Sequence, residues 1–332
     1  MKSMLRLSAV VAIVATLASC SFRTDSKKPT ENNEQPVQSV QVETPVKIPN
    51  TREIVNTLCS DEFEGRLIGT KGNEKAGEYI SKVFKDIGLT PMIEDNYYAA
   101  YTQEVREKYG LVDYNEDKPE NKTVNNVVGV IKGKDNKKAV VISAHFDHIG
   151  YVDEKIIRGA LDNASGLSAL IEIAHTLKEK SKEKTFDMDI VICAFNGEEE
   201  ALAGSRAFVN ELKSKSIYKS LYNINIDSIG AKAGGKLALK NKSKVSDNLY
   251  ASMKTTLKKN NIEFADTAVR GAGDHMSFES ANIPNIFFVQ EGIEKLVHKP
   301  TDTPDTLSYE QIDKIVNAIS DFVEINDGIM FN

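Results

Sequence analysis

The chain has 332 residues, which is enough to bury a large core in one or two domains. Its 41% hydrophobic and 27% charged residues are ordinary for a soluble globular protein. The net charge of −6 and the scattered lysines argue against a nucleic-acid-binding protein, and three cysteines argue against a disulfide framework.

The first residues have the features of a bacterial export signal. Lys2 and Arg6 precede the apolar run LSAVVAIVATLAS, which is short for a transmembrane helix. The run ends in LASC, which resembles the lipobox of bacterial lipoproteins. We therefore expect residues 1–19 to be a signal peptide and Cys20 to be lipidated, which would export the protein and anchor it to the bacterial envelope. An ordinary secretory signal or an uncleaved anchor is the alternative.

A polar segment follows the export signal. Residues 21–50 contain four prolines and show no apolar periodicity. We predict that residues 20–50, starting at the lipidated cysteine, form a flexible linker. No second linker and no internal repeat follow, so residues 51–332 are predicted to form one domain.

Helix and strand patterns alternate along residues 51–332. Apolar runs predict strands at residues 124–133, 138–145, 186–196, 221–230 and 282–290. Amphipathic patterns predict helices at residues 75–88, 163–180, 246–260 and 308–326, and another from the glutamates after residue 196 to about Leu212. This alternation indicates a three-layer α/β/α domain with a mixed, mostly parallel central sheet. Ligand sites in such folds lie just past the carboxyl ends of the strands.

Imidazoles and carboxylates recur at these strand ends or in neighbouring connections. They are His145, Asp162, Glu199, Asp227 and His298. A core histidine at a strand end is the ordinary interpretation of His145 alone, but chance does not readily place five such residues at one edge. Neutral imidazole and carboxylate oxygen are typical zinc ligands, and catalytic zinc sites keep one position for water.

Two zinc ions sharing one carboxylate would use all five side chains. In one arrangement His145, Asp162 and Asp227 hold the first ion. Asp162, Glu199 and His298 would then hold the second.

The remaining acidic residues are assigned supporting roles. Glu198 would act as the general base that takes a proton from the bridging water. Asp147 lies two residues after His145 and is expected to accept the second ring N–H of that histidine. Glu200 is expected to be a carboxylate in the first turn of a helix, where the helix dipole favours it.

Six motifs occur in order and together resemble the M28 family of di-zinc metallopeptidases, typified by secreted bacterial aminopeptidases. They are SAHFDHIG, GALDNASGLSAL, NGEEEALAGSRAF, NIDSIG, GDHMSFESANIP and HKPTDTPDTL. The resemblance covers about residues 51–332 and implies a zinc-dependent exopeptidase fold. It also implies the ligand, base and supporting roles given above, and a peptide substrate whose free amine is held by carboxylates.

The chain departs from this family at two positions. Several secreted aminopeptidases have a tyrosine that stabilises the oxyanion just before the last histidine ligand, whereas this chain has Val297. Many relatives read Gly-Ile-Pro where residues 282–284 read Asn-Ile-Pro. No long insertion follows Gly88, which argues against a protease-associated extra domain.

Several other residues allow two interpretations. His148 is expected to be a loop or supporting residue rather than a ligand, and His175 a structural residue within a helix. Asp274 and His275 are expected near the mouth of the site, where Asp274 either caps a helix or contacts substrate. Arg270 either orients substrate or is an ordinary surface arginine.

The function predicted from these residues is that of an aminopeptidase in which a metal-bound hydroxide attacks the scissile carbonyl. A glutaminyl cyclase shares the fold, but those enzymes typically read His-Tyr-Asp-Ser and place tryptophans around the site, whereas residues 145–148 read His-Phe-Asp-His and the chain has no tryptophan. A non-catalytic peptide-binding domain is the third hypothesis, although such domains usually lose ligands. The preferred N-terminal residue, a dipeptidyl or carboxypeptidase mode, the native metal and the oligomeric state stay open.

Overall fold

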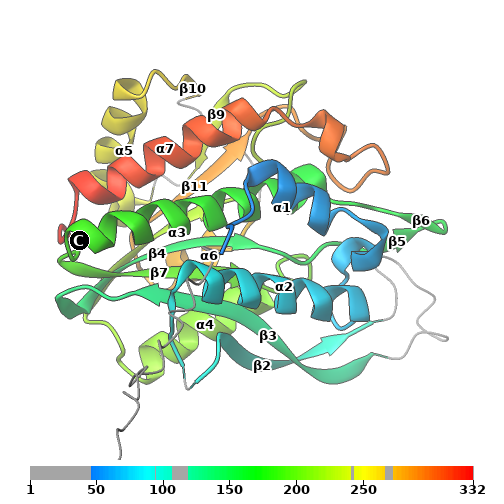
Figure 1. Ribbon diagram of the computed structural model, residues 1–332, viewed down its shortest axis with the longest axis horizontal. Coiled ribbons are helices and arrows are strands. Elements are labelled where there is room, and N and C mark those ends of the chain that lie inside the picture. The colour runs from blue at the N-terminus through cyan, green and yellow to red at the C-terminus, as the bar shows by residue number, and fades with distance from the viewer. Residues whose placement is uncertain (1–45, 94, 107–118, 241–242, 266–271, 332) are drawn as a thin grey trace, which may run out of the picture. The chain divides into compact units, whose positions relative to one another are not determined.

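The computed structural model describes residues 46–93, 95–106, 119–240, 243–265 and 272–331 (Figure 1). The predicted signal peptide, Cys20, most of the predicted linker and Arg270 lie outside the described residues. No helix among the described residues is long and apolar enough to cross a membrane.

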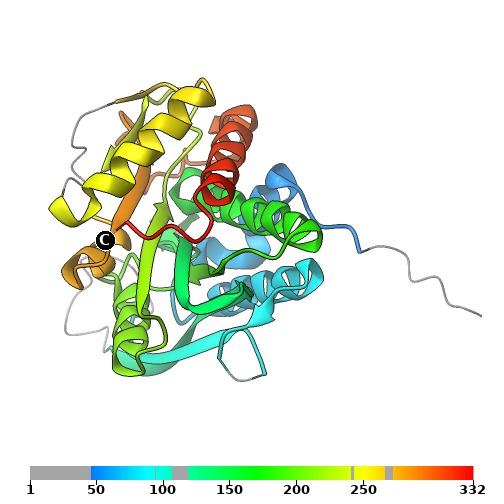
Figure 2. The ribbon, with the colours of Figure 1, turned by 90° about the vertical axis from the view of Figure 1, so that its left-hand side faces the viewer.

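A mixed sheet runs through the middle of the molecule (Figure 2). Within the described residues it has nine strands in the order β1-β3-β7-β4-β8-β11-β9-β10, with β2 paired to β3. The strands are β1 (Thr90–Pro91), β2 (Tyr98–Val105), β3 (Glu120–Ile131), β4 (Asp135–His145), β7 (Met188–Phe195), β8 (Ser220–Ile226), β9 (Leu237–Lys240), β10 (Phe264–Ala265) and β11 (Asn285–Gln290). The central strands β7, β4, β8 and β11 are parallel, whereas β3 and β9 pair antiparallel with β7 and β11.

Helices cover both faces of this sheet, which confirms the predicted three-layer α/β/α architecture. One face is covered by α1 (Thr51–Leu58), α2 (Lys71–Ile87), α3 (Gly166–Glu183), α5 (Asp247–Lys259) and α7 (Tyr309–Ile325). The other face is covered by α4 (Ala203–Ser214) and α6 (His275–Ser280). A small separate hairpin consists of β5 (Tyr151–Val152) and β6 (Lys155–Ile156).

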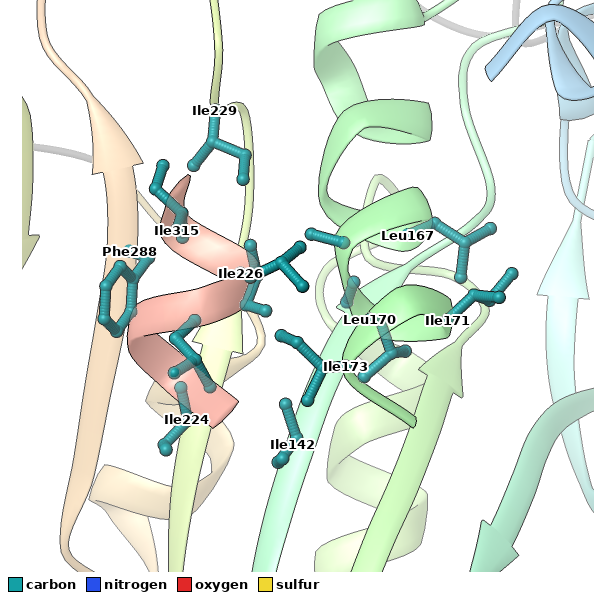
Figure 3. Packing of buried hydrophobic residues seen from close by; sticks show 14 of the residues in the cluster. Ile142, Leu167, Leu170, Ile171, Ile173, Ile224, Ile226, Ile229, Phe288 and Ile315 are labelled. Carbon is teal, nitrogen blue, oxygen red and sulfur yellow. The ribbon is translucent and has the colours of Figure 1, made fainter. Parts of the chain in front are cut away.

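Two apolar layers fill the space between the sheet and its helices. Alternate residues of each strand point to opposite faces, so Ile142 and Ile224 pack toward Leu170 and Ile173 of α3 (Figure 3). On the opposite face, neighbouring strand residues pack against Phe208 of α4. Every residue of β7 is buried, as expected for a central strand covered on both faces.

The predicted helix at residues 75–88 is confirmed but begins earlier, at Lys71. Thr70 caps it, because its side chain accepts the backbone N–H of Asn73. The helix ends where Gly88 adopts a left-handed conformation with φ 83°. This cap fixes the connection into β1 and the antiparallel edge of the sheet.

Candidate metal centre

Three parallel strands bring the first predicted ligands to one edge of the sheet. His145 ends β4 and lies opposite Phe195 at the end of β7. Two residues before His145, Ser143 of β4 lies opposite Asn225 of β8. The connections that carry Glu199 and Asp227 therefore begin beside His145, as the position of ligand sites in α/β sheets predicts.

Asp162 and His298 approach this edge from two loops. Asp162 lies in the irregular turn Ala160–Ser165 that precedes α3. The carboxylate of Asp302, four residues after His298, accepts the backbone N–H groups of Leu161 at 2.7 Å and Asp162 at 3.2 Å. The loop that supplies His298 thus also holds the backbone of Asp162.

The five predicted ligands form two adjoining groups that share Asp162. In the first group, His145 Nε2 lies 3.3 Å from Asp162 Oδ1 and 3.5 Å from Asp227 Oδ1. In the second, His298 Nε2 lies 3.3 Å from Asp162 Oδ2 and 2.9 Å from Glu199 Oε2. Candidate ligand atoms within each group lie within 4.8 Å of one another. Asp162 therefore turns one oxygen toward each group, as a bridging carboxylate would.

These residues fit a bound cation. His145 is 1% exposed, and its Nε2 has no hydrogen-bond partner among the described residues although two carboxylates lie beside it. Several buried carboxylates this close together repel one another unless positive charge lies among them. Imidazole nitrogen with carboxylate oxygen is the donor set that zinc takes in proteins.

Asp147 lies beside the ring of His145, as predicted, and also bonds the turn after β7. Its carboxylate accepts the backbone N–H groups of Glu198 at 3.1 Å and Glu199 at 3.2 Å. The Nδ1 atom of His145 lies 3.2 Å from the backbone carbonyl oxygen of Asp147 and 3.5 Å from its carboxylate. The carboxylate therefore faces the turn after β7 and holds that turn in place.

The prediction that Glu200 lies in the first turn of a helix is wrong. Residues 198–202 form turns, and α4 begins only at Ala203. Ala201 and Leu202 have φ values of 59° and 61°, left-handed conformations that cannot continue a right-handed helix. Because of this turn, the glutamates do not lie on one helix, and the side chain of Glu199 contacts His148 and His298.

The surroundings give Glu198 and Glu199 different acid–base properties. Burial raises the pKa of Glu198 well above its usual range, with the charges of Asp227 and Glu199 acting in the same direction and His145 opposing them. Burial also acts to raise the pKa of Glu199, but hydrogen bonds with His148 and His298 outweigh it, so that pKa is lowered. A carboxyl group with a raised pKa beside a metal site suits proton transfer, and one with a lowered pKa suits ligation.

Three of the residues with open interpretations are placed by the structure. His175 lies within α3 and belongs to neither group. Asp274 precedes α6 without a capping hydrogen bond from its side chain, and His275 stacks on Phe287 with ring centroids 4.2 Å apart. Asp274 and His275 are buried, and Asp274 lies close enough to His145, Asp147 and Asp227 for their charges to affect its pKa.

The structure also gives roles to residues that sequence reasoning did not single out. Arg66 is fully buried and donates to the backbone carbonyl oxygens of Leu58, Phe146, Arg158 and Gly159. It therefore joins the end of β4 to the segment before Asp162. The only sequence signal was its position in EFEGRLIG, within the stretch that resembles the start of the family domain.

Comparisons with known proteins agree with this geometry. A family model described as Peptidase family M28 matches residues 126–323, more than half of the chain. Aminopeptidase YwaD of Bacillus subtilis is 29% identical over 209 residues, which are 60% of this chain and 44% of that protein. The chain thus spans less than half the length of the curated relatives that it matches.

Two solved structures illustrate the likeness of fold. A zinc aminopeptidase from Bacillus subtilis has a TM-score of 0.67 at 17% identity, over 85% of this chain and 96% of that one. A glutaminyl cyclase from Fimbriiglobus ruber has a TM-score of 0.63 at 21% identity, over the same shares of the two chains. At these identities the likeness establishes a shared fold, and it does not distinguish the two activities.

Proposed function

Because this chain belongs to peptidase family M28, we propose that it is a zinc-dependent aminopeptidase that removes N-terminal residues from peptides. The observation that carries the proposal is the pair of adjoining ligand groups sharing Asp162, with the carboxyl group of Glu198 beside them. The amine of the substrate would be held by carboxylates of the site, so a blocked N-terminus should prevent hydrolysis.

Two zinc ions would be held by the groups defined above. Zinc in these positions supplies a Lewis acid for the scissile carbonyl and lowers the pKa of water to about 7. Glu198 would take the proton of the attacking water and pass it to the leaving amine. Asp147 would keep Glu198 in position through the backbone N–H that it accepts. The side chain of His298 is 32% exposed, which supports entry of substrate from that side.

A panel of unblocked aminoacyl anilides, N-blocked peptides and Gln-initiated peptides tests this proposal, with and without chelator. We expect hydrolysis of unblocked substrates only, and none after metal removal. Cyclisation of Gln-peptides without hydrolysis would favour the glutaminyl cyclase. Cleavage of N-blocked peptides would indicate another exopeptidase mode, and peptide binding without turnover would indicate a binding domain.

We also propose that the mature protein is anchored to the bacterial envelope through lipid on Cys20. The lipobox-like LASC and the polar segment after it support this proposal. Metabolic labelling with a fatty acid, followed by membrane fractionation, tests it. A Cys20→Ser variant should lose both the label and the membrane attachment, and a labelled variant would contradict the proposal.

A further inference from the structure

The two ligand groups differ in one respect that the five predicted ligands do not explain. The group of His145, Asp162 and Asp227 has three members, whereas the second group includes a fourth side chain, His148. His148 is 0% exposed, and its Nδ1 lies 2.9 Å from Glu199 Oε1. The imidazoles of His148 and His298 lie 5.4 Å apart, edge to face. Glu199 is therefore contacted by two histidines rather than by one.

The ring of His148 is fixed by close packing. Its backbone N–H donates to the carbonyl oxygen of Arg66, and Gly159 lies directly against the ring. A side-chain carbon at Gly159 would lie 2.6 Å from His148 Cδ2 and 2.7 Å from Arg66 Nη2, too close for either. The absence of a side chain at Gly159 leaves room for the imidazole beside Glu199.

The neighbours of the two ring nitrogens indicate which one carries the proton. A carboxylate oxygen only accepts hydrogen bonds, so Nδ1 beside Glu199 is the donor. The other nitrogen, Nε2, is buried and has no partner among the described residues, so a proton there would be left unpaired. The donation restrains Glu199 Oε1, while His298 Nε2 lies 3.0 Å from Oε1 and 2.9 Å from Oε2.

We propose that His148 is a positioning residue of the second metal site: its Nδ1–H orients the Glu199 carboxylate, and this raises affinity for the second ion. The inference rests on the two-ion site of the proposed function. Hydrogen bonds to ligating side chains typically contribute 10–100-fold to metal affinity. We expect the second equivalent of metal to be affected, and the ion at His145 and Asp227 to be retained.

Metal titration of the full-length protein tests this role with three substitutions. His148→Ala removes the donor. His148→Asn places an amide near the position of Nδ1, whereas His148→Gln places its amide near that of Nε2. Zinc content at buffered free zinc and the visible spectrum during cobalt titration give readouts that do not depend on activity. Thermal unfolding checks folding, and His175→Ala is a matched control, because it removes a histidine outside both groups.

The expected result is a second dissociation constant about 10–100-fold higher in His148→Ala and His148→Gln, with partial recovery in His148→Asn. Wild-type affinity for both ions in His148→Ala would overturn the inference and leave the proposed function intact. Equal weakening in His148→Asn and His148→Ala would overturn the donor role in favour of direct ligation. A wild-type protein that binds no second ion would overturn the two-ion site itself, and this inference with it.

Discussion

Glu198, Glu199 and Glu200 are consecutive residues of one type whose surroundings differ. Glu199 lies between two imidazoles, whereas Glu198 lies near Asp227 and has no comparable hydrogen-bond partner among the described residues. Glu200 is half-buried, and burial followed by the charge of Asp147 raises its pKa. The left-handed residues Ala201 and Leu202 create these differences, because they keep the glutamates out of the helix.

Substitution should separate the roles of these glutamates. We expect Glu198→Gln to lower kcat by about 10²–10⁴-fold while keeping most of the metal, because the variant lacks a base but keeps its shape. Glu199→Ala should lose metal as well as activity. Glu200→Ala should keep most of both and serves as the control. Metal analysis beside steady-state kinetics checks all three, and full activity in Glu198→Gln would contradict the assignment.

We expect Asp302 to stabilise the site through its hydrogen bonds with the backbone of Leu161 and Asp162. Asp302→Asn would replace one acceptor by an NH2 group that faces a buried backbone N–H. We expect the free energy of unfolding to fall by about 1–3 kcal/mol, and metal binding at Asp162 to weaken. Chemical denaturation and zinc titration measure the two effects. Asp305→Asn, which changes an acid nearby in the same loop, is the control, and equal effects in both variants would argue against a specific role.

At the scale of elements, the sequence predicts those strands and helices that show a local apolar pattern. The central strands were predictable as apolar runs, because both of their faces are buried. β2 was not predicted, because its residue types do not follow its alternating burial: Ala100 is exposed, whereas the polar Gln103 is half-buried. α1 was also not predicted, although Asn50 and Glu53 form a readable capping box at its start. The place of β7 between β3 and β4 depends on strand pairing that no local pattern contains.

The residues of the candidate site also include some that could be predicted from the sequence and some that could not. The closeness of the five candidate ligands was predictable, because their residue types recur at strand ends or in neighbouring connections in an order that resembles a known family. The contacts of His148, Arg66 and Asp302 join segments distant in the chain, and such contacts leave no periodic signal. For Asp147, the position beside the ring of His145 was predicted, whereas its bonds to the turn after β7 were not.

The C-terminus of α2 offers a test of local backbone preference. Gly88 has φ 83°, a conformation that costs roughly 1–2 kcal/mol for residues with a side chain. Gly88→Ala should therefore lower the free energy of unfolding by about 1 kcal/mol without changing metal content. Glu78→Ala, on the exposed face of the same helix, should change it by less than about 0.5 kcal/mol. Denaturant titration distinguishes the two, and equal values would contradict the strain argument.

At the scale of the whole molecule, metal binding should be linked to stability. The ligand groups draw on β4, on the loops after β7 and β8, on the turn before α3 and on the loop after β11. A cation bound to either group favours the folded state by RT ln(1 + [L]/Kd), about 4 kcal/mol for each site at a thousandfold excess over Kd. Chelation should therefore lower Tm, and added zinc should restore it. A Tm unaffected by chelator, in a protein shown to contain metal, would contradict this expectation.

The loop that carries His298 and Asp302 determines when, during synthesis, the second ligand group can become complete. It is among the last parts of the fold to be synthesised, yet it supplies a ligand and holds the backbone of Asp162. Contacts between such distant segments form late in folding. A chain whose residues 298–302 are still in the ribosome therefore lacks the complete second ligand group. If the proposed function holds, such nascent chains should be inactive against neighbouring peptides until this loop has docked.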